Sequence, residues 1–232
     1  MRGLLTDNRA GLHPEWLLWQ LSDSAFPTGG FAHSSGLEAA WHHGELRNSN
    51  ELASFVDSSL RQFGRSALPF ALAAHATPDR LSELDQLCES FTLNHVANRA
   101  SRSQGRALFS SAERIFALPE LQELRPGRPG QPAFFHLAPM FGVIARSLGL
   151  NCVTTSRLFL FLHLRALLAS AVRLGIVGPL AAQTLQHGLG ARAEEIVQMS
   201  QGLTIHDIAQ TSPLLELWQG TQDRLYSRLF QS

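Results

Sequence analysis

Apolar residues recur at intervals of three and four along most of this 232-residue chain, and that period constrains the fold more than any other feature. Leu52, Phe55, Val56, Leu60 and Phe63 follow this spacing, which places them on one face of an amphipathic helix. The sequence contains no sustained alternating run of β-branched residues bounded by turn residues, the pattern that predicts strands. We therefore expect an all-α fold, a bundle of about eight to ten helices.

The clearest break in the chain is the segment 124–132, LRPGRPGQP, where prolines and glycines exclude a continuing helix. The sequence on both sides of it has the same apolar helical character. We therefore expect an exposed loop within a single domain that spans residues 1–232, rather than a linker between two domains. Residues 1–13 are expected to be flexible, and residues 223–232 form a distinct C-terminal tail.

The charge composition narrows the possible functions. Nineteen basic and 19 acidic residues give a net charge of zero, which argues against nucleic acid as the main partner. All the basic residues are arginines, because the sequence contains no lysine. Schiff-base chemistry, a lysine general base and a phosphate-loop lysine are therefore excluded.

Cysteine usage and hydropathy indicate a reducing compartment and no membrane span. Cys88 and Cys152 lie far apart, each in an apolar helical context, and we expect both to be buried thiols without a metal. The apolar part of the N-terminus is too short for a secretory signal, so a cytoplasmic location is expected. His163 and Arg165 interrupt the apolar run 158–172, which is shorter than the roughly 20 residues that cross a bilayer.

A loop between two helical segments, in SDSAFPTGGFAHSSGLEAAW, stands out at residues 22–41. Pro27 fixes one backbone angle, and Gly29 and Gly30 permit positive φ, so the loop is expected to have a defined shape. Phe26 and Phe31 flank the turn. They either pack in the local core or face a partner, and the local pattern favours the core.

The same stretch carries the residues that could perform chemistry. His33-Ser34-Ser35-Gly36 places a serine beside a histidine, but a nucleophile elbow needs GxSxG after a strand. Ser34 or Ser35 as the N-cap of the second helix explains these residues better. The adjacent His42 and His43 point about 100° apart on a helix, which does not suit a metal pair. We predict no catalytic residues, no metal site and no cofactor.

Two further segments allow alternatives. Arg99, Arg102 and Arg106 form a row at helical spacing, which is typical of a solvated helix face, whereas Gly105 within the same helix would suit close packing against another backbone. In the tail, DRLYSRLFQS, four large apolar residues recur at helical spacing. Such a tail either docks on its own chain or becomes buried in a partner, and Arg228 could add a bidentate contact to a carboxylate.

Several separated motifs resemble the UreF family of urease accessory proteins. They are DSAFPTGGFAHSSGLEAAW, NRASRSQGRALF, HLAPMFGVIARSLG, SAVRLG and YSRLFQS, and they cover nearly the whole chain after about residue 14. The resemblance implies an all-α, dimeric, non-enzymatic scaffold that bridges UreD (also called UreH) and the GTPase UreG. It would modulate GTP hydrolysis and nickel insertion into apo-urease.

The resemblance also assigns residues for partner binding. In the family the C-terminal tail becomes ordered on UreD/UreH, which implies such a role for Tyr226, Arg228, Leu229 and Phe230. The loop matches a family segment near the dimer and the GTPase-binding surface, and this implies contacts from its residues Pro27, Gly29, Gly30, Phe31 and His33. Two departures concern partner binding: Gln222-Asp223 stands where a His-Glu pair is common, and Pro179 stands where glutamine is frequent.

One alternative function remains open from the sequence. His33, His42 and His43 could converge in the folded chain or across a dimer. The protein would then be a helical small-molecule- or metal-binding protein that uses this region.

Overall fold

The structure is a computed structural model that describes residues 14–124 and 131–232. Within these ranges every regular element is a helix, and ten α-helices have seven or more residues. The all-α prediction is therefore confirmed, and the ten longer helices equal the upper end of the predicted number. The α-helices are α1 (Pro14–Ser22), α2 (Leu37–His42), α3 (Ser49–Ser66), α4 (Leu68–Ala76), α5 (Leu81–Phe91), α6 (His95–Phe116), α7 (Pro119–Gln122), α8 (Leu137–Ser147), α9 (Cys152–Arg173), α10 (Pro179–Gly188), α11 (Gly190–Ser200) and α12 (Pro213–Thr221).

Some predictions concern residues that lie outside this description. The expected flexible segment 1–13 is one of them, and most of the expected loop 124–132 is another. The prediction that the whole chain forms a single domain stays a prediction. Pro179, one of the departures from the family pattern, is the first residue of α10, where its missing N–H costs no helical hydrogen bond.

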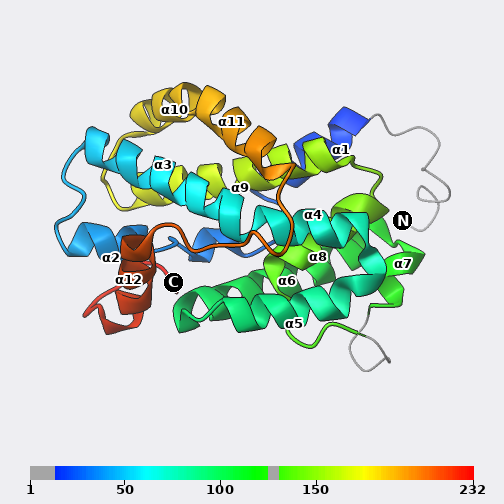
Figure 1. Ribbon diagram of the computed structural model, residues 1–232. Helices are drawn as coiled ribbons and strands as arrows, with labels where there is room; N and C mark the ends of the chain where they lie inside the picture. Colours follow the sequence, from blue (N-terminus) through cyan, green and yellow to red (C-terminus); the bar gives the residue numbers. More distant parts are fainter. Residues whose placement is uncertain (1–13, 125–130) are drawn as a thin grey trace.

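Helix α9 runs through the middle of the molecule (Figure 1), and α3, α4, α10 and α11 pack against it. By length and composition α9 would also pass as a membrane-crossing helix. It contributes instead to both hydrophobic clusters of the core, through Leu158 and Phe159 in one and Leu160, Leu164 and Leu167 in the other. A core helix with neighbours on several sides is apolar nearly all round for this reason.

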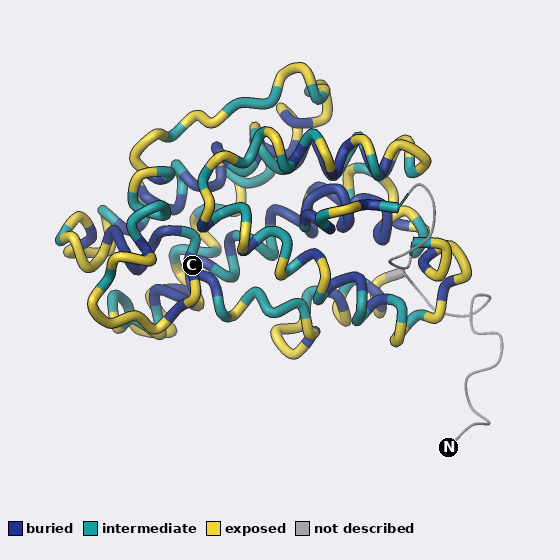
Figure 2. The backbone as a smooth tube through the Cα atoms, turned by 90° about the horizontal axis from the view of Figure 1, so that it is seen from below, coloured by how far each residue is buried: buried dark blue, intermediate teal, exposed yellow. Residues whose placement is uncertain are grey.

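The two clusters lie at different places in the bundle. The larger lies among α4, α5, α6 and α8, and the smaller lies among α2, α3, α9 and α11. Phe63 packs against both, and its ring contacts Phe159 edge-on at a centroid distance of 4.7 Å. The tube in Figure 2 shows buried positions on the inner sides of the helices and exposed positions at the loops.

An irregular segment, residues 134–136, precedes α8 and is held by hydrogen bonds to one side chain. The carboxylate of Asp85 on α5 accepts the backbone N–H groups of Phe134 at 2.7 Å, Phe135 at 3.1 Å and His136 at 2.7 Å. Phe135 has a φ of 61°, in the left-handed region that non-glycine residues rarely adopt. Three hydrogen bonds to one buried carboxylate hold the segment in this conformation.

Gly105 allows this segment to lie directly against α6. A Cβ atom at Gly105 would be 1.9 Å from the carbonyl oxygen of Phe135, so only glycine allows the approach. Close packing of the arginine-containing helix is thus confirmed at Gly105, and Arg99 and Arg106 on the same helix are exposed, as a solvated face predicts. The side chain of His136 completes the contact, because its ring nitrogens lie 3.0 Å from Ser101 Oγ and 2.8 Å from Glu89 Oε2.

Candidate partner-binding surface

The loop after α1 has the defined shape that its sequence predicts. Asp23 accepts the N–H of Ala25 at 2.8 Å, and Ser111 on α6 donates to the carbonyl of Pro27 at 2.8 Å. Gly29 has a φ of 72° and precedes a short 3-10 helix, Gly30–Ala32. Pro27 is exposed and both glycines are half-buried, so the backbone of this turn lies at the surface.

The start of the second helix differs from the prediction. Ser35 and Gly36 have φ values of 53° and 85°, and neither residue can join a right-handed helix in that conformation. Helix α2 therefore begins at Leu37 with Gly36 as N-cap, so the predicted Ser34 or Ser35 cap is wrong. Ser34 Oγ still accepts the N–H of Glu38 at 3.4 Å.

The two phenylalanines of the loop have opposite environments. Phe26 is buried and stacks on Phe116 at a centroid distance of 6.2 Å. Phe31 is 75% exposed. The local preference for the core is thus confirmed for Phe26 and wrong for Phe31, because the turn at Gly29 directs the two side chains to different sides.

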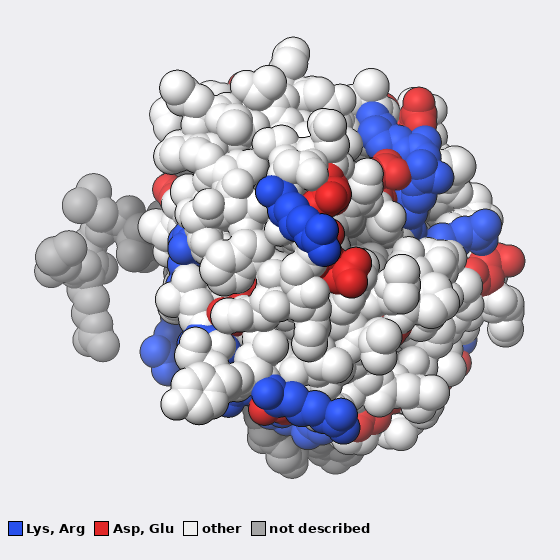
Figure 3. All heavy atoms as spheres, turned by 90° about the vertical axis from the view of Figure 1, so that its left-hand side faces the viewer, with Lys and Arg blue, Asp and Glu red and all other residues white. Residues whose placement is uncertain are grey.

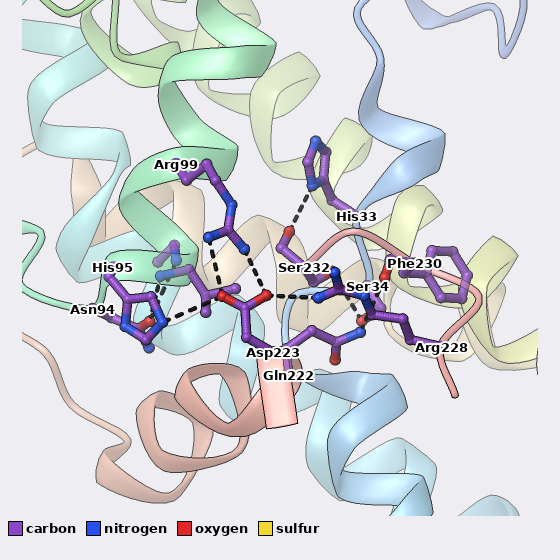
Figure 4. A network of polar contacts seen from close by, with 12 residues as sticks. His33, Ser34, Asn94, His95, Arg99, Gln222, Asp223, Arg228, Phe230 and Ser232 are labelled. Carbon is purple, nitrogen blue, oxygen red and sulfur yellow. Dashed lines mark hydrogen bonds and ion pairs between the residues drawn. The ribbon is translucent and has the colours of Figure 1, made fainter. Parts of the chain in front are cut away.

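The C-terminal tail returns to this loop, and Ser232 lies beside His33 and Ser34 (Figure 4). The N–H of Gln231 donates to the carbonyl of Ala32 at 2.8 Å, and the N–H of Ser34 donates to the carbonyl of Ser232 at 2.5 Å. Residues 225–232 form no helix, so the helical reading of their spacing is wrong. We call residues 27–33 and 225–232 together the loop–tail surface.

Glu38, a buried carboxylate on α2, holds the tail. It accepts the N–H of Leu229 at 2.5 Å, the N–H of Phe230 at 3.1 Å and the side-chain amide of Gln222 at 2.5 Å. Glu38 is 1% exposed, and a buried carboxyl group needs hydrogen-bond donors from the protein in place of water. The contact fixes the backbone of the tail and leaves several of its side chains uninvolved.

Phe230 is the tail residue that enters the molecule. It is 2% exposed, and the guanidinium of Arg173 on α9 lies over its ring at 4.3 Å from the centroid, a cation–π contact. Arg173 also donates to the carbonyl of Phe31. One arginine therefore joins the loop to the tail, and Phe230 is buried on its own chain.

Asp223 forms the second anchor of the tail. Arg99 on α6 donates to both oxygens of Asp223, at 3.0 and 2.9 Å, and Arg228 donates at 2.6 Å. The hydrogen bonds from Arg99, followed by that from Arg228, lower the pKa of Asp223 to about 2. His95 Nε2 lies 3.4 Å from the same carboxylate. Gln222 and Asp223, which depart from the family pattern, thus contact Glu38 and Arg99, respectively.

The three histidines of the alternative function do not meet. His33 is buried, and its Nδ1 lies 2.6 Å from Ser232 Oγ; burial, with a smaller effect from Arg99, lowers its pKa below 6.5. His43 Nε2 lies 3.3 Å from Thr221 Oγ1, while His42 packs edge-on against Trp41. Among the described residues no three His, Cys, Asp or Glu side chains are grouped so that they could hold a metal ion.

A cavity of about 340 Å³ adjoins the loop. Gly30, Phe31 and His33 line it together with residues of α3 and α9, among them His163. Ser59 Oγ lies 2.9 Å from His163 Nε2, and burial lowers the pKa of His163 to about 4. The cavity thus contains one of the three histidines of the alternative function.

The loop–tail surface presents large side chains that are exposed. Tyr226 is fully exposed, and Leu229 is 52% exposed. On the side of the molecule that carries α2 and α12, arginines and acidic residues adjoin one another in small groups, and most atoms belong to neither kind (Figure 3). This mixture suits recognition by shape and apolar contact rather than by a field of one sign.

Sequence reasoning missed Glu38 and Arg173, which hold the tail in place. A signal for Glu38 was available: it is the only charged residue in the apolar stretch Leu37–Trp41, and a carboxylate inside an apolar helix face needs a partner. Arg173 gave no such signal, because arginine is common in the last turn of a helix.

Comparison with known proteins agrees with the resemblance that the sequence motifs indicate. A family model described as UreF matches residues 46–190. Urease accessory protein F from Oryza sativa subsp. indica is 43% identical over 222 residues, which is 94% of this chain and 85% of that protein. The Arabidopsis thaliana protein of the same name is 38% identical over 229 residues, or 97% and 95% of the two chains. Urease accessory protein UreF from Arthrobacter sp. (strain FB24) is 31% identical over 219 residues, or 93% and 96%. The chain belongs to the UreF family of urease accessory proteins.

Proposed function

We propose that this protein is a non-catalytic scaffold that bridges UreD (UreH) and the GTPase UreG. In that position it modulates GTP hydrolysis and supports nickel insertion into apo-urease. Membership of the UreF family supports a role in a urease accessory complex. We further propose that it acts as a homodimer in the cytoplasm.

The observation that carries the proposal is the composition of the loop–tail surface. Tyr226, Leu229 and Phe31 are large and exposed, and hydrogen bonds hold the backbone at Leu229 and at Phe31. Covering such a side chain contributes roughly 1.5 to 3 kcal/mol, and a fixed backbone lowers the entropy lost on binding. Aromatic side chains of this kind are the usual anchors of protein interfaces.

The test compares one double variant of the tail with one single control variant in an assay of binding to UreD/UreH. Tyr226→Ala combined with Leu229→Ala removes exposed tail side chains and leaves Glu38, Asp223 and Phe230 in place. The matched control is Leu180→Ala on α10, a leucine that is 86% exposed. We expect the double variant to bind UreD/UreH about 30-fold more weakly, equivalent to about 2 kcal/mol, and the control to bind normally.

A deletion of residues 223–232 completes the experiment. Binding of the deleted form to UreD/UreH at the wild-type affinity would contradict the tail assignment. The loop is tested separately with Phe31→Ala and purified UreG: unchanged affinity for UreG and unchanged GTP hydrolysis in the complex would contradict its role towards the GTPase.

The cavity beside the loop favours one second candidate, a small-molecule site. It is lined by His33 and His163 and has room for a small ligand. Native mass spectrometry of the chain purified from its host would reveal a bound molecule at one per chain. Replacing His163 by leucine should then abolish its retention, and loss of the molecule without loss of UreD/UreH binding would separate the two functions.

A further inference from the structure

The two cysteines of the chain, remote from the loop–tail surface in sequence, have different surroundings. Cys152 is half-buried, which corrects the expectation that both thiols are buried, and its Sγ lies 3.3 Å from Nδ1 of His75 on α4. Cys88 is buried, and its Sγ lies 3.9 Å from the hydroxyl Oγ1 of Thr92. Only Cys152 thus combines a neighbouring base with partial access from solvent.

The hydrogen bond of His75 to a backbone carbonyl determines the tautomer of its neutral ring. Nε2 lies 2.7 Å from the carbonyl oxygen of Leu150. A carbonyl only accepts, so the proton of the neutral ring is on Nε2 and the lone pair of Nδ1 points to the thiol. A nucleophile, a base within reach and a third group that orients the base are the arrangement that activates a cysteine.

The position of Cys152 in the fold adds to this activation. It is the first residue of α9, a helix of 22 residues, whose N-terminus is capped by the side chain of Asn151. Free backbone N–H groups at a helix N-terminus stabilise a thiolate.

Cys88 supplies a comparison within the same molecule. Burial raises the pKa of its thiol to about 12, and the nearby carboxylates of Asp85 and Glu89 act in the same direction. A thiol in such surroundings stays protonated and inert. The fold therefore separates one protected thiol, Cys88, from one thiol, Cys152, that lies beside a histidine base.

We propose that Cys152 and His75 form a thiol-modification site whose substrates are low-molecular-weight disulfides such as oxidised glutathione. His75 Nδ1 accepts the thiol proton, and the Cys152 sulfur attacks one sulfur of the disulfide. The new S–S bond forms as the old one breaks. The leaving thiolate takes the proton from His75, so that Cys152 is oxidised, the departing sulfur is reduced and the ring returns to its starting state. This site is independent of the proposed scaffold function.

The experiment measures mixed-disulfide formation with oxidised glutathione by mass spectrometry of the folded full-length chain. We expect an adduct on Cys152 at a rate at least about tenfold above that on Cys88. His75→Gln keeps an N–H for the carbonyl of Leu150 but has no basic nitrogen, and it should slow the adduct on Cys152 about tenfold or more. Equal rates at the two cysteines, or an unchanged rate in the variant, would overturn the proposal.

A second measurement needs no variant and so does not depend on how His75→Gln folds. The rate at Cys152 is compared between the native chain and the same chain in guanidinium chloride, with Cys88 as the internal standard. Native structure should raise the rate at Cys152 and lower the rate at Cys88. A lower rate at Cys152 in the native chain would show a merely protected thiol and would overturn the proposal.

Discussion

Two buried carboxylates, Asp85 and Glu38, hold irregular backbone in this molecule. The packing around the two contacts differs. Asp85 accepts three N–H groups of residues 134–136, and Glu38 accepts two N–H groups of the tail. Both acids are 1% exposed. The segment at Asp85 is also locked by Gly105 and by the side chain of His136, whereas the tail at Glu38 carries exposed side chains on either side of Phe230.

The difference shows that a buried carboxylate that accepts backbone N–H groups can either stabilise the fold or hold a segment that remains free to bind a partner. If the contact at Asp85 breaks, Phe135 and His136 remain buried and their N–H groups lose every partner, which costs about 1 to 3 kcal/mol for each group. If the tail leaves Glu38, both the carboxylate and the tail N–H groups regain water. The surrounding packing, not the hydrogen bonds themselves, decides which contact can open.

Asp85→Ala should therefore have the largest effect on stability. We expect the free energy of unfolding to fall by about 4 kcal/mol, because buried N–H groups are left without acceptors. Urea denaturation measures it, with Asp79→Ala at an exposed position as the matched control. A loss as small as that of the control would remove the distinction between the two carboxylates.

Gly105→Ala tests the lock on the same segment. The added methyl group would overlap the carbonyl oxygen of Phe135, and we expect a loss of about 3 kcal/mol in the free energy of unfolding. Gly188→Ala, at a helical glycine with open space around it, is the control and should be neutral or slightly stabilising. Similar thermal unfolding midpoints for the two variants would contradict the close approach.

Glu38→Ala should affect the tail more than the whole fold. We expect a loss of about 1 to 2 kcal/mol in the free energy of unfolding. Hydrogen exchange should show loss of protection at the N–H groups of Leu229, Phe230 and Gln231, with residues 134–136 unchanged. Unchanged exchange in the tail would mean that Glu38 does not hold it.

The smallest effect is expected from pH. The pKa of His33 in the docked state lies below its ordinary 6.5, so the neutral form binds the tail better than the protonated form. Docking is fully present above about pH 6.5 and weakens as the pH falls below that value. Hydrogen exchange of Gln231, corrected for its intrinsic pH dependence, should show this trend, and His33→Gln should abolish it. The same trend in the variant would assign it to another group.

The fold was largely predictable because the spacing of apolar residues indicates which positions of a helix are buried. The amphipathic pattern of Leu52, Phe55 and Val56 predicted α3, which the side chain of Asn48 caps. Gly105 in the middle of α6 correctly indicated a close backbone approach, but its partner at Phe135 was not predictable, because nothing local links residues 30 positions apart.

The candidate site was predictable only in part. The loop and the tail were both identified, yet their contact joins residues near 30 and 230, and sequence pattern carries no information about such a pairing. The spacing of Leu225, Tyr226, Leu229 and Phe230 suggested a helix, but hydrogen bonds from the tail backbone to Glu38 and to the loop replaced helical ones. Long-range backbone pairing overrides local periodicity in such cases.

The pairing of the tail with the loop has a consequence for the order of folding. His33 and Ser232 are 199 positions apart in the sequence, so their contact closes a loop that contains almost the entire chain. Contacts of such separation carry the largest closure entropy and form after local helices have assembled. The helical core therefore assembles while residues 225–232 are still undocked, and these residues can meet a partner before they meet the loop.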